Sequence, residues 1–441
     1  MRRLIVFLLL LVVLSVTMAS ACYAQLALPV VTKMGNGLTV ILLENHSSEL
    51  VAVDIWVKAG SSNETPKNNG VSHFIEHLVF GSTLKRRPGD MDVEMESIGG
   101  VLSARTSRDW AHFSTTVSSR YLAKALDVLA DAMMNAQFPE HEIQRERFVL
   151  LDEVRRLESD PVEVCKTTIA SMVFGAHPYG LPIQGSTDSI KAITREDVLN
   201  YYHEYYTPNN AAVVLVGDID PQKALSEVGK AFQGWSASTK PQPQLPEAQP
   251  LNERVVKRVE GTFKQTYLTI GFLGPRGSDY EDVCATDVLL SYLGYGYRSW
   301  LEDEVMNKMG LASAVSADFL TQRDRGMITI FAATTQANVE KVRDLVFDKI
   351  TEIRTRGIPD ESLALAKRSL LGRYAFQNET VEGIANSFGF YFAVSEPEFA
   401  VKYVNCVQAV RNEDIIRVAQ KYLDPDRAAI MLLAPKEGGV E

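Results

Sequence analysis

The sequence is poor in cysteine and lacks any block of basic residues. Its 4 cysteines in 441 residues are too few for a scaffold held together by disulfides. Asp and Glu number 55 against 45 Lys and Arg, a net charge of −10, which excludes the basic surface that nucleic acids or anionic membranes require. The hydrophobic share of 46% excludes a disordered chain. We therefore expect a folded protein of two or more domains with no nucleic-acid partner.

Long apolar runs are also scarce, and the one present lies at the N-terminus. Arg2 and Arg3 precede an apolar run from Leu4 to Val16, which is followed by small residues up to Ala24. This order is typical of an export signal, so we expect residues 1–24 to be removed as a signal peptide.

Two alternatives stay open at this end of the chain. A short membrane anchor carries the same pattern, although the run is short for a bilayer span. Cleavage before Cys22 would leave a cysteine that can be lipid-modified and anchor the protein. The mature chain has 43 basic and 55 acidic side chains, a net charge of −12, and no further apolar run long enough for a transmembrane helix. We expect it to be exported, to the bacterial periplasm or outside the cell.

The interior of the chain is divided by a proline-rich segment. Residues 236–252 hold four prolines and almost no apolar periodicity, which is typical of an extended linker. The segment separates residues 25–235 from residues 253–441, and each of these halves is long enough to bury a core of its own.

The two halves repeat one another at a constant offset in the numbering. Residues 192–198 match residues 409–415, and residues 205–215 match residues 422–432. In both places a helix, a proline turn and a buried strand follow in the same order. We interpret the repeat as the duplication of a whole domain.

Within the first half, runs of strands come before runs of helices. In residues 51–57 apolar side chains alternate, which indicates a strand. This order predicts the α+β class, with a mainly antiparallel sheet and helices packed on one face in each half. The predicted strands are 28–33, 38–43, 51–57, 101–106 and 109–117, and the predicted helices are 67–80, 121–135, 139–158 and 161–174.

His73, Glu76 and His77 form a compact pattern on the first predicted helix. The two imidazoles are four residues apart, so they project from one face and can bind a single metal ion. Glu76 lies on nearly the same face, where it can act on a water activated by that metal. The alternative is a surface helix with unconnected polar residues. Because Phe74 and Ile75 make the rest of the helix apolar, we favour buried histidines that need a partner.

A site with two histidines needs a third ligand, most often a carboxylate in hydrolytic zinc enzymes. Glu146 and Glu153 are seven residues apart on one predicted helix and therefore share a face. Spacing alone does not choose among the carboxylates of this helix, which are Glu140, Glu142, Glu146, Asp152, Glu153 and Glu158.

The inverted motif His-x-x-Glu-His, the duplicated halves and the distant Glu resemble the pitrilysin/insulinase family of zinc peptidases, particularly its short-chain branch, which includes mitochondrial processing peptidase. This resemblance implies a processing-peptidase-like metallohydrolase fold and one Zn²⁺ per chain. It implies His73, His77 and Glu153 as ligands, since Glu153 follows His77 at the distance typical of the family's third ligand. It further implies a catalytic role for Glu76 as general base and for Glu146 as a supporting carboxylate.

Residues 99–106 resemble the family's edge strand, onto which a peptide substrate adds as a further strand. Ser103 and Ala104 stand where family members usually carry Asn-Ala. The short hydroxyl can still hydrogen-bond a substrate backbone, so we name both as substrate-binding candidates. The alternative is that residues 101–106 form a plain strand of the sheet.

The second half lacks the metal motif, and no histidine follows His203. In active family members this half usually supplies an Arg and a Tyr that bind the substrate backbone and the developing oxyanion. The matching stretch here carries Met306 and Ser313 instead. Some short-chain members divide the zinc motif and the Arg/Tyr pair between two chains, and this sequence resembles the chain that bears zinc.

Three functions follow from these observations. We favour an exported zinc-dependent endopeptidase subunit that cleaves unfolded peptides or flexible segments and is completed, as a heterodimer, by a homologous partner carrying the Arg/Tyr pair. The first alternative is a self-sufficient homodimeric peptidase. The second is a non-enzymatic peptide-binding or scaffold subunit, against which the intact set of His73, Glu76, His77 and Glu153 argues.

Overall fold

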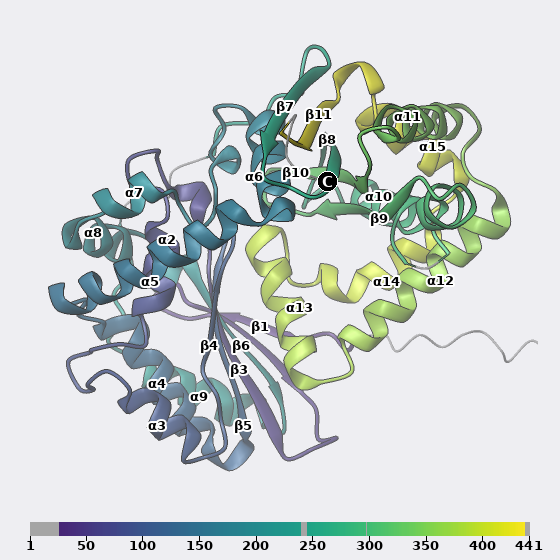
Figure 1. Cartoon of the computed structure of the whole chain (residues 1–441). Helices are drawn as coiled ribbons and strands as arrows, with labels where there is room; N and C mark the ends of the chain where they lie inside the picture. The colour runs from purple at the N-terminus through teal and green to yellow at the C-terminus, as the bar shows by residue number, and fades with distance from the viewer. Residues whose placement is uncertain (1–25, 240–244, 297, 437–441) are drawn as a thin grey trace, which may run out of the picture.

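The computed structural model describes residues 26–239, 245–296 and 298–436. The expected export signal, including Cys22, lies outside these residues. Two sheets and the helices around them make up the fold (Figure 1). Nowhere in the described parts of the chain is a helix long and apolar enough to cross a membrane.

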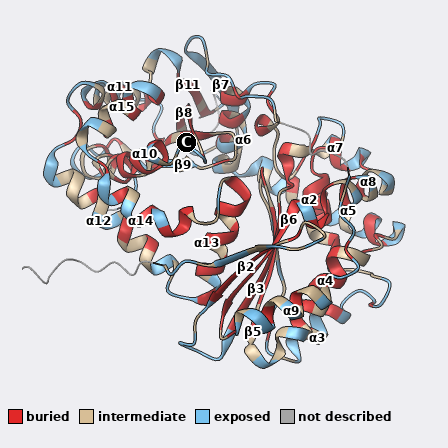
Figure 2. Ribbon diagram, turned by 180° about the vertical axis from the view of Figure 1, so that it is seen from behind, coloured by how far each residue is buried: buried red, intermediate tan, exposed pale blue. Residues whose placement is uncertain are grey.

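The first sheet has six strands in the order β1-β2-β6-β3-β5-β4. β2 and β6 run parallel, and every other neighbouring pair is antiparallel. Its central strands are buried (Figure 2), as expected for apolar strands that are covered on both faces. The strands are β1 (Val30–Lys33), β2 (Thr39–Glu44), β3 (Leu50–Val57), β4 (Ser103–Thr106), β5 (Ala111–Ser118) and β6 (Ala211–Gly217).

The second sheet has five strands in the order β7-β11-β8-β10-β9, with β7 and β11 parallel and the rest antiparallel. This order repeats β2-β6-β3-β5-β4 of the first sheet. The predicted α+β class with two homologous halves is therefore confirmed, and each sheet contains one parallel pair. The strands are β7 (Val255–Gly261), β8 (Thr266–Arg276), β9 (Ala312–Leu320), β10 (Arg325–Thr334) and β11 (Ala429–Pro435).

The helices repeat in the same way. α5 and α12 begin at Glu140 and Asp360, and α6 and α13 begin at Pro161 and Val381, so both pairs share one offset. In the first half the helices are α2 (Val71–Leu78), α3 (Asp90–Glu96), α4 (Leu122–Asn135), α5 (Glu140–Ser159), α6 (Pro161–Phe174), α7 (Thr187–Ala192), α8 (Arg195–Tyr205) and α9 (Pro221–Ala231). In the second half they are α10 (Tyr280–Leu293), α11 (Val339–Arg356), α12 (Asp360–Gln377), α13 (Val381–Val394), α14 (Phe399–Ala409) and α15 (Asn412–Tyr422), with a π-helix, η5, at Leu301–Lys308.

Each half covers the other's sheet with one helix. α4 and α9 pack on one face of the first sheet, whereas the opposite face is covered by α13 from the second half (Figure 1). Reciprocally, α6 from the first half packs on β8 and β11. Because α6 and α13 are equivalent in the repeat, the two halves exchange equivalent helices, and neither sheet is fully covered without the other half.

The exchanged helices meet their sheets through side chains of complementary size. Gly389 of α13 lies against Trp56 of β3, where a Cβ added to the glycine would come 1.9 Å from the indole Nε1. At the equivalent contact the sizes are reversed: Gly271 of β8 receives Ile169 of α6, whose Cγ1 lies 2.6 Å from the position of an added Cβ. Each pair therefore combines one bulky residue with one glycine.

A buried polar network joins the two halves beside this contact. The Tyr179 hydroxyl donates to Asp109 Oδ1 at 2.6 Å and accepts from the backbone nitrogen of Asp324 at 3.1 Å. Asp324 Oδ2 in turn accepts from the backbone nitrogen of Ala248, in the predicted linker, at 2.8 Å. The described linker residues, 236–239 and 245–252, contain neither helix nor strand. The network thus fixes the turn between β9 and β10 to the first half.

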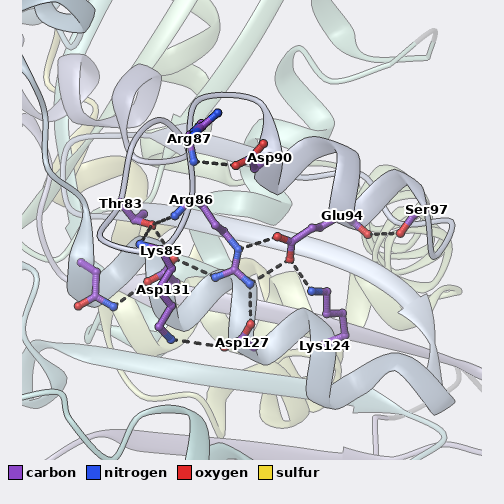
Figure 3. A network of polar contacts seen from close by, with 11 residues as sticks. Thr83, Lys85, Arg86, Arg87, Asp90, Glu94, Ser97, Lys124, Asp127 and Asp131 are labelled. Atoms are coloured by element: carbon purple, nitrogen blue, oxygen red, sulfur yellow. Dashed lines mark hydrogen bonds and ion pairs between the residues drawn. The ribbon is translucent and has the colours of Figure 1, made fainter.

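Arg86 anchors the segment that follows α2 (Figure 3). The guanidinium donates to Asp131 Oδ2 at 2.8 Å, to Glu94 Oε2 at 2.9 Å and to Asp127 Oδ2 at 2.5 Å. Arg86 is 8% exposed and Asp131 is 1% exposed, so this ion pair is shielded from water. The hydrogen bond from Arg86 is the largest of the effects that lower the pKa of Glu94 to about 2. The network ties the segment between α2 and α3 to α3 and α4.

We expect Arg86→Met to lower the free energy of unfolding by about 3 kcal/mol, because it leaves the buried Asp131 carboxylate without its cation. Urea denaturation at neutral pH measures the loss. Arg87→Met is the matched control, since Arg87 is exposed and bonds Asp90 through its backbone nitrogen. Glu94 contributes stability above its unfolded pKa of 4.5 and loses it as the pH falls toward 2. The difference between parent and variant should therefore narrow in acid, and equal stability at neutral pH would contradict this role.

Candidate metal centre

α2 begins at a buried carboxylate that sets its first turn. Glu64, 4% exposed, accepts from the backbone nitrogens of Gly70 at 2.7 Å and Ser72 at 2.9 Å. Gly70 has a φ of 95°, a conformation that favours glycine. The helix therefore starts at Val71 rather than at residue 67 as predicted. A carboxylate at this end of the helix also interacts favourably with the positive end of the helix dipole.

Three of the predicted site residues lie together on α2 and α5. His73 Nε2 is 3.8 Å from Glu153 Oε1, and His77 Nε2 is 3.6 Å from Glu153 Oε2. One ligand atom from each of the three residues lies within 4.8 Å of the others. In the described ranges no other group of three His, Cys, Asp or Glu side chains is gathered in this way. The structure thus brings the two histidines and Glu153 to one point.

The burial of His73 fits a metal ligand. His73 is 6% exposed, and burial, together with the neighbouring His77, lowers its pKa to about 3. The imidazole is therefore neutral at physiological pH, with a nitrogen lone pair available. No hydrogen bond from the described residues reaches either ring nitrogen. Two imidazoles and a carboxylate are a donor set that zinc prefers, so these residues fit the ion that the sequence implies.

Arg147 packs α5 against α2 and so places Glu153. Its Nη2 donates to the carbonyl of Ile193 at 2.7 Å, and its Nη1 donates to the carbonyl of Ile190, at the end of α7. The same guanidinium lies 5.5 Å from the ring centroid of Phe74 on α2. These contacts fix the position of α5, which carries Glu153, relative to α2, which carries the two histidines.

Glu146 contacts the side of His77 that faces away from Glu153. Its Oε2 is 3.6 Å from His77 Nδ1, and its Oε1 accepts from Arg145 Nε at 2.9 Å. A carboxylate on the outer nitrogen of a ligating histidine fixes the orientation of the ring. The contact agrees with the supporting position predicted for Glu146 but does not test a catalytic role.

Glu76 faces the strand β4. Burial raises its pKa, and a hydrogen bond with Thr106 of β4 and the electrostatic effect of His77 act in the opposite direction. The carboxyl therefore lies close both to His77 and to Thr106 at the edge of the first sheet, within reach of a group bound there.

β4 is an edge strand that lies alongside α2. Ser103 and Ala104 pair with Ser114 and Phe113 of β5, and no described strand pairs with the opposite edge of β4. Ser103 is exposed and Ala104 is half-buried. The backbone of the free edge therefore remains able to accept one more strand beside the metal centre.

In the described part of the second half there is no counterpart of the metal centre. At the offset that α5 and α12 share, Glu146 corresponds to Ala366 and Glu153 to Arg373, as predicted from the sequence. Met306 is half-buried in η5, and Ser313 is exposed on β9 with its hydroxyl donating to the carbonyl of Ala333 at 3.3 Å.

The sequence-based interpretation gave no role to the residues that position the site. Glu64 precedes the predicted helix in a polar loop and carries no local capping pattern. Arg147 follows Glu146 on a predicted helix, and Thr106 is the last residue of a predicted strand. A signal exists for Arg147 alone, because a charged residue between the apolar Ile143 and Leu150 has to find partners when its helix is packed.

Comparison with known proteins agrees with this arrangement. The model of the insulinase family, peptidase family M16, matches residues 39–187, and the model of the peptidase M16 inactive domain matches residues 192–370. The chain is 26% identical over 401 residues to an uncharacterized zinc protease, YmxG, of Bacillus subtilis, covering 91% of this chain and 97% of that protein. It is 26% identical over 416 residues to the probable mitochondrial-processing peptidase subunit beta of Arabidopsis thaliana, covering 92% and 78%.

The fold also matches a solved structure. A protease from Helicobacter pylori superposes with a TM-score of 0.87 at 24% identity, covering 92% of this chain and 99% of that one. The match to the insulinase family model contains the inverted motif with its distant glutamate, and the match to the inactive-domain model extends from the first half into the second. The chain belongs to the insulinase family of peptidases, family M16.

Proposed function

We propose that this protein is a zinc-dependent endopeptidase whose metal ligands are His73, His77 and Glu153. The observation that carries the proposal is the convergence of these three side chains within 4.8 Å, beside Glu76 and the free edge of β4. The names of the relatives support it, since the Bacillus subtilis protein is called a zinc protease and the Arabidopsis protein a processing peptidase.

The residues of the chain divide the chemistry between them. A bound zinc ion would supply Lewis-acid chemistry, which makes water nucleophilic near neutral pH and polarises a carbonyl. Glu76 takes the proton of the attacking water on its carboxylate and delivers it to the nitrogen of the leaving amine. Burial of Glu76 raises its pKa and so favours the protonated form that makes this delivery.

The free edge of β4 supports a peptide as the substrate. An extended segment that pairs with Ser103 and Ala104 makes backbone hydrogen bonds, which any sequence can form. Since such pairing requires an extended backbone, the substrates are unfolded peptides or flexible segments rather than folded domains.

We also propose that a homologous partner chain completes the site. Met306 and Ser313 stand where an Arg and a Tyr are expected, and Ser313 is exposed with its hydroxyl bonded to backbone of its own sheet. A self-sufficient homodimer is the second candidate, and it requires another residue to bind the oxyanion. Export to the periplasm or the medium rests on Arg2, Arg3 and the apolar run that follows them.

The test is cleavage of a quenched fluorescent peptide library by purified residues 25–441. The chain with one equivalent of zinc is compared with the same chain freed of metal by a chelator. We expect one zinc ion per chain, no cleavage by the chain alone, and zinc-dependent cleavage by the double variant Met306→Arg/Ser313→Tyr, which restores the missing pair. Cleavage by the unmodified chain alone would instead favour the homodimer. A zinc-loaded double variant that cleaves nothing would favour a peptide-holding subunit.

A further inference from the structure

A cavity lies in the C-terminal half, at the place that corresponds in the repeat to the metal centre of the first half. It has a volume of about 320 Å³ and lies between α10, α12, α14 and β9, which lie together in Figure 1. α10 and α12 hold the positions in the second half that α2 and α5 hold in the first. The cavity plays no part in the proposed metal chemistry.

The strand register shows that the two positions are equivalent. Across the second sheet, Ala317 of β9 pairs with Ile330, which pairs with Ile270 and then with Ile430. Across the first sheet, Ala104 pairs in turn with Phe113, Ile55 and Val213. Val213 and Ile430 are matching positions of the sequence repeat. Ala317, on the wall of the cavity, therefore corresponds to Ala104 at the edge of the metal centre.

Arg373 supplies the only positive charge on the cavity wall among the described residues, at the position that corresponds to the ligand Glu153. Its guanidinium lies 3.3 Å from the ring centroid of Tyr295. A guanidinium stacked on a ring in this way keeps its N–H groups free at the edge of its plane. No hydrogen bond or ion pair joins these N–H groups to any part of the chain that the structure describes. A half-buried guanidinium whose N–H groups lack hydrogen-bond acceptors is costly unless a ligand supplies them.

The two acidic groups of the cavity, Asp287 and Asp318, interact electrostatically with this cation from a distance. Asp287 accepts a hydrogen bond from the Tyr403 hydroxyl at 2.7 Å, and Asp318 accepts one from Ser316 at 3.0 Å. Neither carboxylate forms an ion pair with Arg373. Two carboxyl groups beside a single cation repel a ligand of high negative charge, such as a polyphosphate, more strongly than a ligand with one negative charge.

Besides these charged groups, the lining has seven apolar or aromatic residues and two polar ones, Ser291 and Gln377. Leu290, Phe319, Leu370 and Tyr374 are among the apolar and aromatic ones, so they offer contacts to an apolar group next to the anionic end of a ligand. A volume of this size suits a small ligand rather than a single inorganic ion. A short peptide with an apolar last residue meets both requirements.

We propose that this cavity binds the terminal carboxylate of a short peptide, with the guanidinium of Arg373 forming paired hydrogen bonds to the carboxylate. Two parallel N–H···O bonds are the usual geometry between a guanidinium and a carboxylate. The choice of a peptide rests on the proposed function, because cleavage of a peptide bond creates a new terminal carboxylate, whereas the choice of a carboxylate rests on Arg373.

The experiment is a binding titration of the metal-free full chain with dansyl-Ala-Ala-Phe as the free acid. Removing zinc prevents cleavage and prevents the carboxylate from binding at the metal centre, so the result does not depend on peptidase activity. The same peptide as its C-terminal amide tests the carboxylate. Dansyl-Ala-Ala-Glu-amide tests whether a side-chain carboxylate serves as well.

We expect the free acid to bind at least tenfold more tightly than either amide. Arg373→Gln should weaken its binding by about ten- to a hundredfold, the usual worth of hydrogen bonds to a charged group, and Arg373→Lys should lose part of it. Arg368→Gln, an exposed position on the same helix, is the matched control and should bind as the parent does. Thermal unfolding checks that Arg373→Gln remains folded.

Three results would overturn the proposal. They are the absence of binding to the parent chain, equal binding of the acid and the phenylalanine amide, and unchanged binding in folded Arg373→Gln. Tight binding of the glutamate amide would overturn the assignment to a terminal carboxylate. None of these results bears on cleavage at the first half, so a failure here is distinguishable from a failure of the proposed function.

Discussion

Glu76→Gln is expected to lower kcat/KM for peptide cleavage by about 10²- to 10⁴-fold, the usual contribution of a positioned general acid–base. The amide keeps the shape of the side chain but cannot take a proton from water. Glu76 is not one of the three converging ligands, so zinc content should stay at the parent value. The assay is the rate of cleavage of one quenched peptide by whichever form of the protein proves active, with zinc determined on the same sample.

Asp152→Asn is the matched control for this experiment. Asp152 is also an acidic residue near the site in sequence, on α5 next to Glu153, but its side chain is 68% exposed and is paired with Arg156. Its variant should cleave as fast as the parent. If Glu76→Gln cleaved at the parental rate while holding zinc, the proton transfer assigned to Glu76 would be wrong.

Gly389→Ala is expected to lower the free energy of unfolding by about 3 kcal/mol, even though alanine is the better helix former. Helix propensity alone predicts a gain of about 1 kcal/mol. The new Cβ would, however, stand 1.9 Å from Trp56 Nε1, so α13 has to move away from the first sheet. Overpacking of this kind costs about 1–3 kcal/mol and occasionally more, and the contact lies where the two halves exchange helices.

Gly372→Ala on α12 is the control for the propensity term, since nothing lies within 4 Å of a Cβ at that position. It should stabilise the protein when measured by urea denaturation. Trp56→Phe in the Gly389→Ala background removes the atoms nearest the new methyl group and should recover part of the loss. Gly389→Ala with stability equal to or above that of the parent would contradict the packing described here.

The exchange of helices explains what the sequence could and could not predict. Local patterns predicted the α+β class, the repeat and the helix that bears His73 and His77, because apolar periodicity and motif spacing are local properties. The packing of α13 on β3 and β6 is a contact between segments that lie far apart in the chain. The only sequence feature that marks this packing is a glycine within an apolar helix. Taken alone, such a glycine indicates only a residue that forms helix poorly.

In the candidate site, too, local patterns predicted some features and contacts between distant segments decided the others. The spacing of His73 and His77 follows from helix geometry, whereas the choice of Glu153 among six carboxylates came from the family resemblance. Spacing does not reveal which helix faces which. The structure supplies that information through Arg147, which holds α5 at the end of α7 and against Phe74.

The most direct test of the metal centre is an anomalous-scattering measurement at the zinc absorption edge on crystals of the zinc-loaded protein. We predict one peak per chain, about 2.0–2.2 Å from a nitrogen of His73, a nitrogen of His77 and an oxygen of Glu153. A zinc-loaded crystal with no peak at this point, or with its peak among other side chains, would contradict the assignment of these three residues as the ligands.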